Sequence, residues 1–368
     1  MSWIGINPFP PGFASRKARP NMAFDPSGAH GENLDADTLL VRGTVMFESE
    51  IPILAQQAIP LLAFQSDIGW RRRFSVMLES ANAVRLTLVQ GNAVSTAVLS
   101  SAEFVAGARI RVSYTWDAPA RSAHMTVQML DRFSIHQAYM PNPLPLPLAD
   151  LREIVSIGRA TVVDDAISCI AIADHLAPIC LNSGLMRGNL VRTTDGYRPV
   201  ERLALGDRVE TATGASMPIR WITRTEVPAV GQFAPVRLRA PYFGLVQDIV
   251  VAQSQGVLMT GADAEYLFGA EEVLVKADDL TNLHSVQYEP DLPVIDYYQI
   301  LLDSHECINV GGCWVESLYV GQLGSAPGMT RTTSLADLPA AALPRHSRSV
   351  ARSLRSYEAM SLLTELTA

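Results

Sequence analysis

The sequence contains few charged and few aromatic residues, and only four cysteines in 368 residues. Its 29 basic residues are outnumbered by 37 acidic ones, which gives a formal net charge of −8. Because nucleic-acid-binding proteins usually present a basic face, we expect no nucleic-acid partner. The cysteines form no CxxC pair, so the sequence predicts neither a metal site nor a disulfide framework, and nothing in it indicates a cofactor. Their positions are Cys169, Cys180, Cys307 and Cys313. If Gly311-Gly312 is a two-residue hairpin turn, Val310 faces Cys313 and Cys307 faces Glu316, so Cys307 and Cys313 point to opposite sides of the sheet and cannot form a disulfide.

Long hydrophobic runs are also missing. The longest apolar stretch, residues 51–64, is interrupted by two prolines and two glutamines, which excludes a membrane-spanning helix there. The first residues, MSWIGINPFPPGF, lack a charged start followed by an apolar run, so no secretory signal is predicted. We therefore expect a cytoplasmic protein, or one that is exported by a route that needs no N-terminal signal. The length suggests two domains and a tail.

The first half of the chain has the pattern of an antiparallel β-sandwich. Residues 84–90 and 108–116 alternate apolar and polar side chains, and turn residues follow each run. Strand-like sequence resumes at 154–157 and 167–173. Short strands with no long helical pattern indicate two packed sheets. The strand order and the segment 156–167 resemble the concanavalin/laminin-G type of jelly roll, which predicts such a sandwich over residues 1–175.

Aromatic and basic residues of this half have either a ligand-binding or a purely structural role. Trp70, Tyr114 and Trp116 would stack on sugar rings if they were exposed, but the alternation puts Tyr114 and Trp116 on the core side, so we favour the core for these aromatic residues. The run of arginines at 71–73 is either an anion-binding patch or a solvated surface, and we favour the surface. Sandwiches of this type often bind glycans, so a glycan or protein ligand of this domain is a hypothesis.

The second half carries short motifs in a set order. The opening segment 180–209 contains an Asp195-Gly196 turn and ends in LALGDRV. Further short segments follow at 218–222, 234–238, 265–269, 273–277 and 302–317. In order and spacing they resemble the Hint superfamily, the fold shared by Hedgehog C-terminal domains and inteins, and most closely its bacterial subgroup. The resemblance implies an all-β Hint domain over residues 176–325.

The resemblance also implies a chemistry, an acyl shift at the peptide bond before the first residue of the domain. Cys180 fits the position of the nucleophile, and the bond Ile179–Cys180 would then react. Residues 185–188 are extra relative to the family opening. If they are not an insertion, the nucleophile slot falls on Gly184, which has no side chain. The remaining alternative is that Cys180 is an ordinary cysteine between two domains.

Two further positions of the family site depart from its pattern or stay ambiguous. A buried histidine should protonate the leaving nitrogen, but Gln255 stands in its slot. His305 matches a histidine common in the closing hairpin, where it either orients the site or is structural. Inteins end in His-Asn, whereas the matching end here is VES at 315–317, and this excludes protein splicing.

The tail, residues 326–368, is predicted to be a linker followed by an amphipathic helix. The helix is expected from His346; a basic amphipathic helix either contacts a membrane or a partner or docks its apolar face on its own domain, and we favour docking. The residues of this face are Val350, Leu354, Tyr357, Met360 and Leu363.

We therefore expect an all-β protein: a jelly-roll-like sandwich, a Hint-type domain and a short C-terminal helix. The leading hypothesis for its function is an autoprocessing Hint protein with a degenerate site, capable at most of a single self-cleavage before Cys180. The rival hypothesis is a non-catalytic binding or scaffold protein whose sandwich recognises a glycan or a protein. The sequence assigns no oligomeric state.

Overall fold

The chain folds into two compact units, residues 1–177 and 178–368, as seen in a computed structural model. The structure describes residues 2–9, 23–24, 38–53, 57–79, 82–131, 134–181, 183–289, 292–321, 323 and 327–367. Strands are the main regular structure of the described chain, and the paired strands are antiparallel with one exception near the C-terminus. This confirms the predicted all-β fold class with a short helix at the end of the chain.

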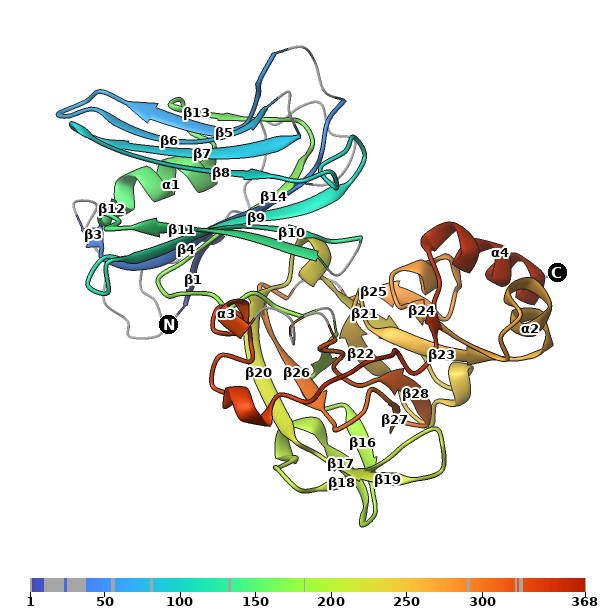
Figure 1. Cartoon of the computed structure of the whole chain (residues 1–368). Helices are drawn as coiled ribbons and strands as arrows, with labels where there is room; N and C mark the ends of the chain where they lie inside the picture. Colours follow the sequence, from blue (N-terminus) through green and yellow to red (C-terminus); the bar gives the residue numbers. More distant parts are fainter. Residues whose placement is uncertain are drawn as a thin grey trace. The chain divides into compact units, whose positions relative to one another are not determined.

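The first unit is a sandwich of two antiparallel sheets, which Figure 1 shows stacked face to face. The larger sheet has the strand order β11-β10-β9-β4-β14-β1-β2, and the smaller one has the order β13-β5-β6-β7-β8. A two-stranded ribbon, β3-β12, and helix α1 complete the unit. The bounds are β1 Trp3–Pro8, β2 Ala23–Phe24, β3 Leu39–Leu40, β4 Arg42–Glu50, β5 Ile59–Ser66, β6 Arg72–Glu79, β7 Ala83–Gln90, β8 Ala93–Ser100, β9 Arg109–Asp117, β10 Ser122–Met129, β11 Ser134–Pro141, β12 Leu146–Pro147, α1 Leu148–Ser156, β13 Thr161–Val163 and β14 Ile167–Ala173.

The core of the sandwich lies between the sheets and is formed by the inward side of the alternating strands. Tyr114 and Trp116 are buried in it, as the alternation predicts, and their rings stack 5.6 Å apart. Trp70 does not join them: it is 41% exposed, because it lies in the turn before β6, where no strand directs its side chain inward. The prediction of a core position for Trp70 was wrong.

Helix α1 corrects a second prediction. Residues 154–157 were expected to be extended, but α1 spans Leu148–Ser156 and ends at Ile157, which adopts a left-handed conformation. The sequence LADLREIVS places Leu148, Leu151 and Val155 on one helical face, and all three are buried. Residues 154–157 taken alone have the composition of a strand, because three of the four are β-branched.

The second unit contains two further sheets. One has the order β20-β26-β15-β22-β21-β25, and the other has the order β19-β18-β16-β27-β28-β23-β24-β29, with β17 paired to β16. The bounds are β15 Leu185–Met186, β16 Leu190–Thr193, β17 Gly196–Pro199, η2 Val200–Arg202, β18 Arg208–Glu210, β19 Ser216–Pro218, β20 Trp221–Pro228, η3 Gly231–Phe233, β21 Pro235–Leu238, η4 Tyr242–Gly244, β22 Ile249–Ala252, β23 Gly256–Thr260, α2 Ala262–Phe268, β24 Glu272–Lys276, η5 Asp279–Asn282, β25 Val286–Tyr288, β26 Val294–Leu301, β27 Cys307–Val310, β28 Cys313–Glu316, α3 Pro327–Thr330, η7 Ala340–Ala342, β29 Arg352–Ser353 and α4 Ser356–Thr367.

The hairpin β27–β28 has the register that the sequence predicts. Val310 faces Cys313 across the Gly311-Gly312 turn, and Cys307 faces Glu316. Because successive side chains of a strand point to opposite faces, Cys307 and Cys313 lie on opposite sides of the sheet and are not joined. Among the described residues no helix is both long and apolar enough to cross a membrane.

The tail is more ordered than a linker, and its helix starts later than predicted. Within residues 327–345, Thr333, Leu335 and Leu338 are buried. The C-terminal helix α4 begins at Ser356 rather than at His346, because residues 352–353 form strand β29 alongside β24. Leu354, Ala359, Leu362 and Leu363 join the core of the second unit, whereas Tyr357 and Met360 are exposed, contrary to the predicted apolar face.

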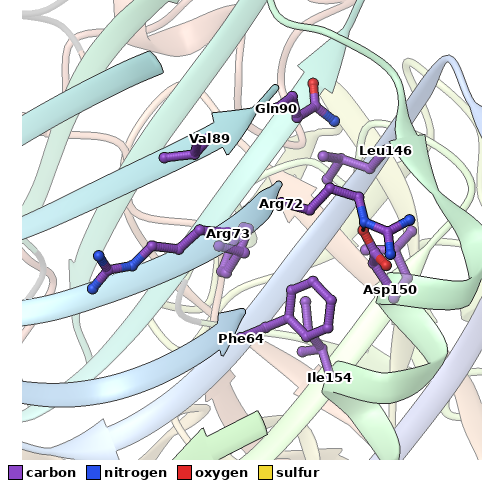
Figure 2. Close-up of a pocket in the computed structure, with 10 residues that line it drawn as sticks. Phe64, Arg72, Arg73, Val89, Gln90, Leu146, Asp150 and Ile154 are labelled. Atoms are coloured by element: carbon purple, nitrogen blue, oxygen red, sulfur yellow. Dashed lines mark ion pairs between the residues drawn. The ribbon is translucent and has the colours of Figure 1, made fainter. Parts of the chain in front are cut away.

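One arginine of the 71–73 run is drawn into the sandwich. Arg72 has a side chain only 17% exposed, and its Nε lies 3.4 Å from Oδ2 of Asp150 in the first turn of α1. Figure 2 shows this pair beside a cavity of about 20 Å³, which has room for about one water molecule. Burial raises the pKa of Asp150 to about 6, although the neighbouring Arg72 acts in the opposite direction.

We predict that Asp150 makes the first unit less stable as the pH rises. Its pKa is higher in the folded state than the value of roughly 4 in an unfolded chain, so the folded state binds the extra proton between these values. Stability from this group is therefore present at low pH and is lost as the pH rises through about 6. Between about pH 5 and about pH 7 the loss amounts to roughly 1 kcal/mol.

Urea unfolding of the full chain at both pH values measures this. Asp150→Asn should reduce the pH dependence of the unfolding free energy by that amount, whereas Asp67→Asn, at an exposed carboxylate of the same unit, should not. Equal pH dependence in the wild type and in Asp150→Asn would contradict the assignment.

Candidate functional site

The candidate site lies at the start of the second unit, where the chain enters its sheets. Ile179 is bonded on both sides to the tail: its N–H donates to the carbonyl of Thr332 over 2.8 Å, and its carbonyl accepts from the N–H of Ser334 over 3.2 Å. Gly184 precedes β15, and its carbonyl accepts from the N–H of Ala252 at the end of β22 over 2.8 Å. Ile179 is therefore held by the tail, and Gly184 by the end of β22.

Gln255, in the slot of the family's acid histidine, lies directly against Gly184. It occupies the turn between β22 and β23 and is 1% exposed. Its Oε1 accepts a hydrogen bond of 2.9 Å from the backbone N–H of Gly184. Its Nε2 donates to the carbonyl oxygen of Glu316 over 2.9 Å and to that of Gly256 over 3.3 Å. Two carbonyl acceptors on one side require the amide nitrogen there, which directs the oxygen to Gly184.

Gln299 binds the carbonyl end of the Ser183–Gly184 peptide bond, whose N–H end is bound by Gln255. It projects from β26, is 4% exposed, and donates through Nε2 to the carbonyl oxygens of Ser183 and Leu181, both over 2.7 Å. Its Oε1 accepts from the hydroxyls of Thr223 over 3.1 Å and Ser334 over 2.8 Å. The Ser183–Gly184 peptide bond is thus bound at its carbonyl by Gln299 and at its N–H by Gln255.

Tyr297 fills the space beside Gly184. A Cβ atom added at Gly184 would come within 2.9 Å of Cβ and Cγ of Tyr297, closer than such atoms approach in proteins. The ring is also anchored at its far end, where its hydroxyl donates to the carbonyl of Phe233 over 3.1 Å. Burial raises the pKa of this hydroxyl, so it stays protonated and keeps donating. Glycine is therefore the residue that fits at position 184 without movement of Tyr297.

Cys180 lies four residues before Gly184 and is partly buried. It is not in a disulfide, and its Sγ is 3.8 Å from the carbonyl oxygen of Pro178. The printed sequence alone leaves open whether Cys180 or Gly184 stands in the nucleophile slot. The hydrogen bond from Gly184 to Gln255 bears on this question, because an acid that protonates the leaving nitrogen has to lie next to that nitrogen.

His305, the third predicted site residue, is 5% exposed and contacts the same strand end as Gln255. Its Nε2 lies 3.1 Å from the carbonyl oxygen of Ser317 and 3.4 Å from Oε2 of Glu316. Its Nδ1 accepts from the backbone N–H of Val350 over 3.1 Å, so the proton of the neutral ring is on Nε2. Glu316 also accepts from the N–H of Gly256 through Oε1 over 2.9 Å. Glu316 therefore links His305 to the turn that carries Gln255.

The sequence analysis missed Gln299, Tyr297 and Glu316. A detectable signal exists only for Gln299, a neutral polar residue within the apolar strand Val294–Leu301. Tyr297 and Glu316 are ordinary strand residues, and only the pairing of the strands brings them to the site.

The arrangement can orient a peptide bond. A donor such as Gln299 polarises a carbonyl as an oxyanion-binding group does. A glutamine does not transfer a proton at ordinary pH, and Gln255 presents its acceptor oxygen, rather than a donor, to the N–H of Gly184. Among the residues that the structure describes, no cluster of histidine, cysteine and carboxylate side chains is arranged to hold a metal ion.

Solved structures similar to parts of this chain include proteins of several classes, all at low identity. The AceL NrdHF class 3 split intein, in a splice-inactive variant, is 12% identical with a TM-score of 0.27, and the match covers 37% of this chain and 99% of the intein. The CBM40 module of a Ruminococcus gnavus sialidase is 13% identical with a TM-score of 0.25, over 37% of this chain and 77% of that one. Sheep galectin-11 is 11% identical with a TM-score of 0.22, over 36% and 84%. TM-scores this low carry no argument about fold or function.

No curated protein matches the chain. A family model does: the model described as Hint domain matches residues 180–322. The match begins at Cys180 and includes Gly184, Gln255, Gln299 and His305. Residues 180–322 of this chain form a Hint domain.

Proposed function

We propose that this Hint domain is of the autoprocessing type but does not cleave itself, and that the chain acts as an intact binding or scaffold protein. The hydrogen bond from Gly184 to Gln255 is the observation that supports this most directly. Gly184 is the residue next to Gln255, and it has no side chain that could act as a nucleophile. Tyr297 occupies the space into which a side chain at this position would point.

In this proposal the Ser183–Gly184 peptide bond, which Gln255 and Gln299 bind, has a structural role. Gln255 and Gln299 satisfy the buried N–H of Gly184 and the buried carbonyls of Leu181 and Ser183. A buried backbone group without a partner costs about 1–3 kcal/mol, so these neutral amides stabilise the entry of the chain into the domain. They do so without the cost of burying a charge.

Residual cleavage at Ile179–Cys180 is the second candidate. Cys180 is partly exposed and lies within three residues of the start of the second unit, where cleavage would separate the sandwich from the Hint domain. Against this candidate, the backbone N–H that Gln255 contacts is that of Gly184, four residues after Cys180.

Intact-mass measurement of the expressed chain distinguishes the two candidates. We expect a single unbroken species with and without dithiothreitol from about pH 6 to about pH 9, a range that spans thiol ionisation. The Cys180→Ala variant should behave identically. A thiol-dependent fragment that ends at Ile179, and that is absent from Cys180→Ala, would instead establish the cleavage reaction and overturn the proposal.

The structural role of Gln255 predicts a loss of stability on truncation. Gln255→Ala leaves the N–H of Gly184 and the carbonyl of Glu316 without this partner, at roughly 1–3 kcal/mol for each group. Urea unfolding of the full chain should therefore show a decrease of at least about 2 kcal/mol. Gln287→Ala, at an exposed position of β25, should change stability by no more than about 0.5 kcal/mol. Equal effects of the two substitutions would refute this role.

For the sandwich we propose a glycan ligand that binds at the surface around Trp70. The exposed indole has the Arg72 guanidinium carbon 5.2 Å from its centre, and an aromatic face next to a fixed donor is suited to a sugar ring. The cavity beneath Arg72 is too small for a sugar, so the ligand would lie on the surface.

A glycan array probed with the full chain tests this ligand. We expect binding that Trp70→Ala weakens about tenfold, the equivalent of about 1.4 kcal/mol of stacking. Val162→Ala, at an exposed residue of β13, is the control and should leave binding unchanged. Absence of any glycan binding, or equal binding by Trp70→Ala, would rule out this surface as the glycan site.

A further inference from the structure

Two buried histidines connect the tail to the closing hairpin of the Hint domain. His305 lies between β26 and β27, and His346 lies in the segment that leads to β29. Each is 5% exposed. Their ring centres are 6.1 Å apart with the rings nearly parallel, and the ring of Tyr319 lies against both, at 4.9 Å from His305 and 5.9 Å from His346.

The two rings use their nitrogens in the same way. His305 accepts the backbone N–H of Val350 at Nδ1 over 3.1 Å, and its Nε2 faces the carbonyl oxygen of Ser317 over 3.1 Å. His346 accepts the backbone N–H of Val320 at Nδ1 over 3.3 Å, and its Nε2 faces the carbonyl oxygen of Leu302 over 3.1 Å. Both rings are therefore neutral, with the proton on Nε2.

The four contacts connect segments in a reciprocal way. His305 belongs to the body of the domain and binds the tail at Val350, whereas His346 belongs to the tail and binds the body at Val320 and Leu302. The hydroxyl of Ser349 adds a contact of 3.3 Å to Nδ1 of His305. Residues 346–350 are thus attached to the body through two imidazole rings.

Protonation is incompatible with this arrangement. A charged imidazole carries a proton on both nitrogens, so Nδ1 of either ring would direct an N–H at a backbone N–H that now donates to it. Two charged rings would also repel each other at 6.1 Å. The loss of one buried acceptor leaves the N–H of Val350 or Val320 without its partner.

The charged groups around the rings act in both directions. Glu316 on β28 lies 3.4 Å from Nε2 of His305 and favours a positive charge there, and Asp303 after β26 favours one on His346. Asp303 is itself paired with Arg220, and exposed Arg345 and Arg348 flank His346 on its own segment.

At His346 the effect of burial on the pKa outweighs that of Asp303. Desolvation is the largest influence on its pKa and lowers it below the ordinary value of 6.5. A histidine whose pKa is lower in the folded state contributes stability that is present above pH 6.5 and is lost as the pH falls below it.

We propose that His305 and His346 form an acid-sensitive clamp, which holds residues 346–350 on the Hint domain at neutral pH and releases them when the rings take up protons. The pairing of β29 with β24 and the packing of α4 remain as separate attachments of the tail. The release is therefore local: it frees residues 346–350, which precede β29. The release also removes the hydrogen bond from Val350 to His305, the histidine that lies next to Glu316.

Amide hydrogen exchange of the full chain, corrected for the intrinsic pH dependence of exchange, tests the clamp. The two amides to follow are those of Val320 and Val350. We expect their protection to fall at least about tenfold between about pH 7.5 and about pH 5, whereas the amides of β20 and β26 keep theirs. A tenfold change in amide protection is the change in an equilibrium constant that a shift of one pKa unit produces.

Variants separate titration of the clamp from general acid effects. In the His305→Asn/His346→Asn double variant, an amide oxygen can accept the same N–H groups without titrating, so the acid-induced loss should disappear. His284→Asn, at an exposed histidine of the same unit, should retain it. Unchanged protection of the wild type at about pH 5 would overturn the proposal, and so would the same pH dependence in the double variant.

Discussion

Buried amide side chains hold the entry of the chain into the second unit, and the geometry of the candidate site depends on them. Gln255 and Gln299 each have both ends of their amide engaged, and together they hold Leu181, Ser183 and Gly184. A charged group at either position would have to be buried without a partner of opposite charge, which costs far more than burying a neutral amide. The neutral amides therefore allow an irregular segment to lie inside a β fold.

The end of β28 is where the site and the tail meet. The backbone carbonyl of Glu316 accepts from Gln255, while its carboxylate contacts His305 and the N–H of Gly256. His305 in turn accepts from the tail at Val350. A disturbance of the tail would thus reach Gln255 through two side chains. Glu316 and Gln255 thus lie between the acid-sensitive contacts proposed above and the peptide bond that the glutamines hold.

The role of position 184 could be predicted only in part from the sequence. The sequence left Cys180 and Gly184 as alternatives for the nucleophile slot, because the count of residues before the first strand fits either. The hydrogen bond between Gly184 and Gln255 favours Gly184, and it joins residues 71 positions apart. Tyr297 and Glu316 were not candidates at all. Their importance comes from strand pairing, which places Tyr297 opposite Met186 and Glu316 opposite Cys307.

The sequence by itself determined the all-β class, the buried Tyr114 and Trp116, and the register of the β27–β28 hairpin, because alternation and turn residues act over a few positions. It also carried the motifs of the Hint domain. Only the tertiary structure decided that residues 154–156 are helical, that Trp70 is exposed and Arg72 drawn inward, and that the tail is bonded to Ile179 and His305. These depend on contacts between residues distant in the chain, whose free energies a local pattern does not contain.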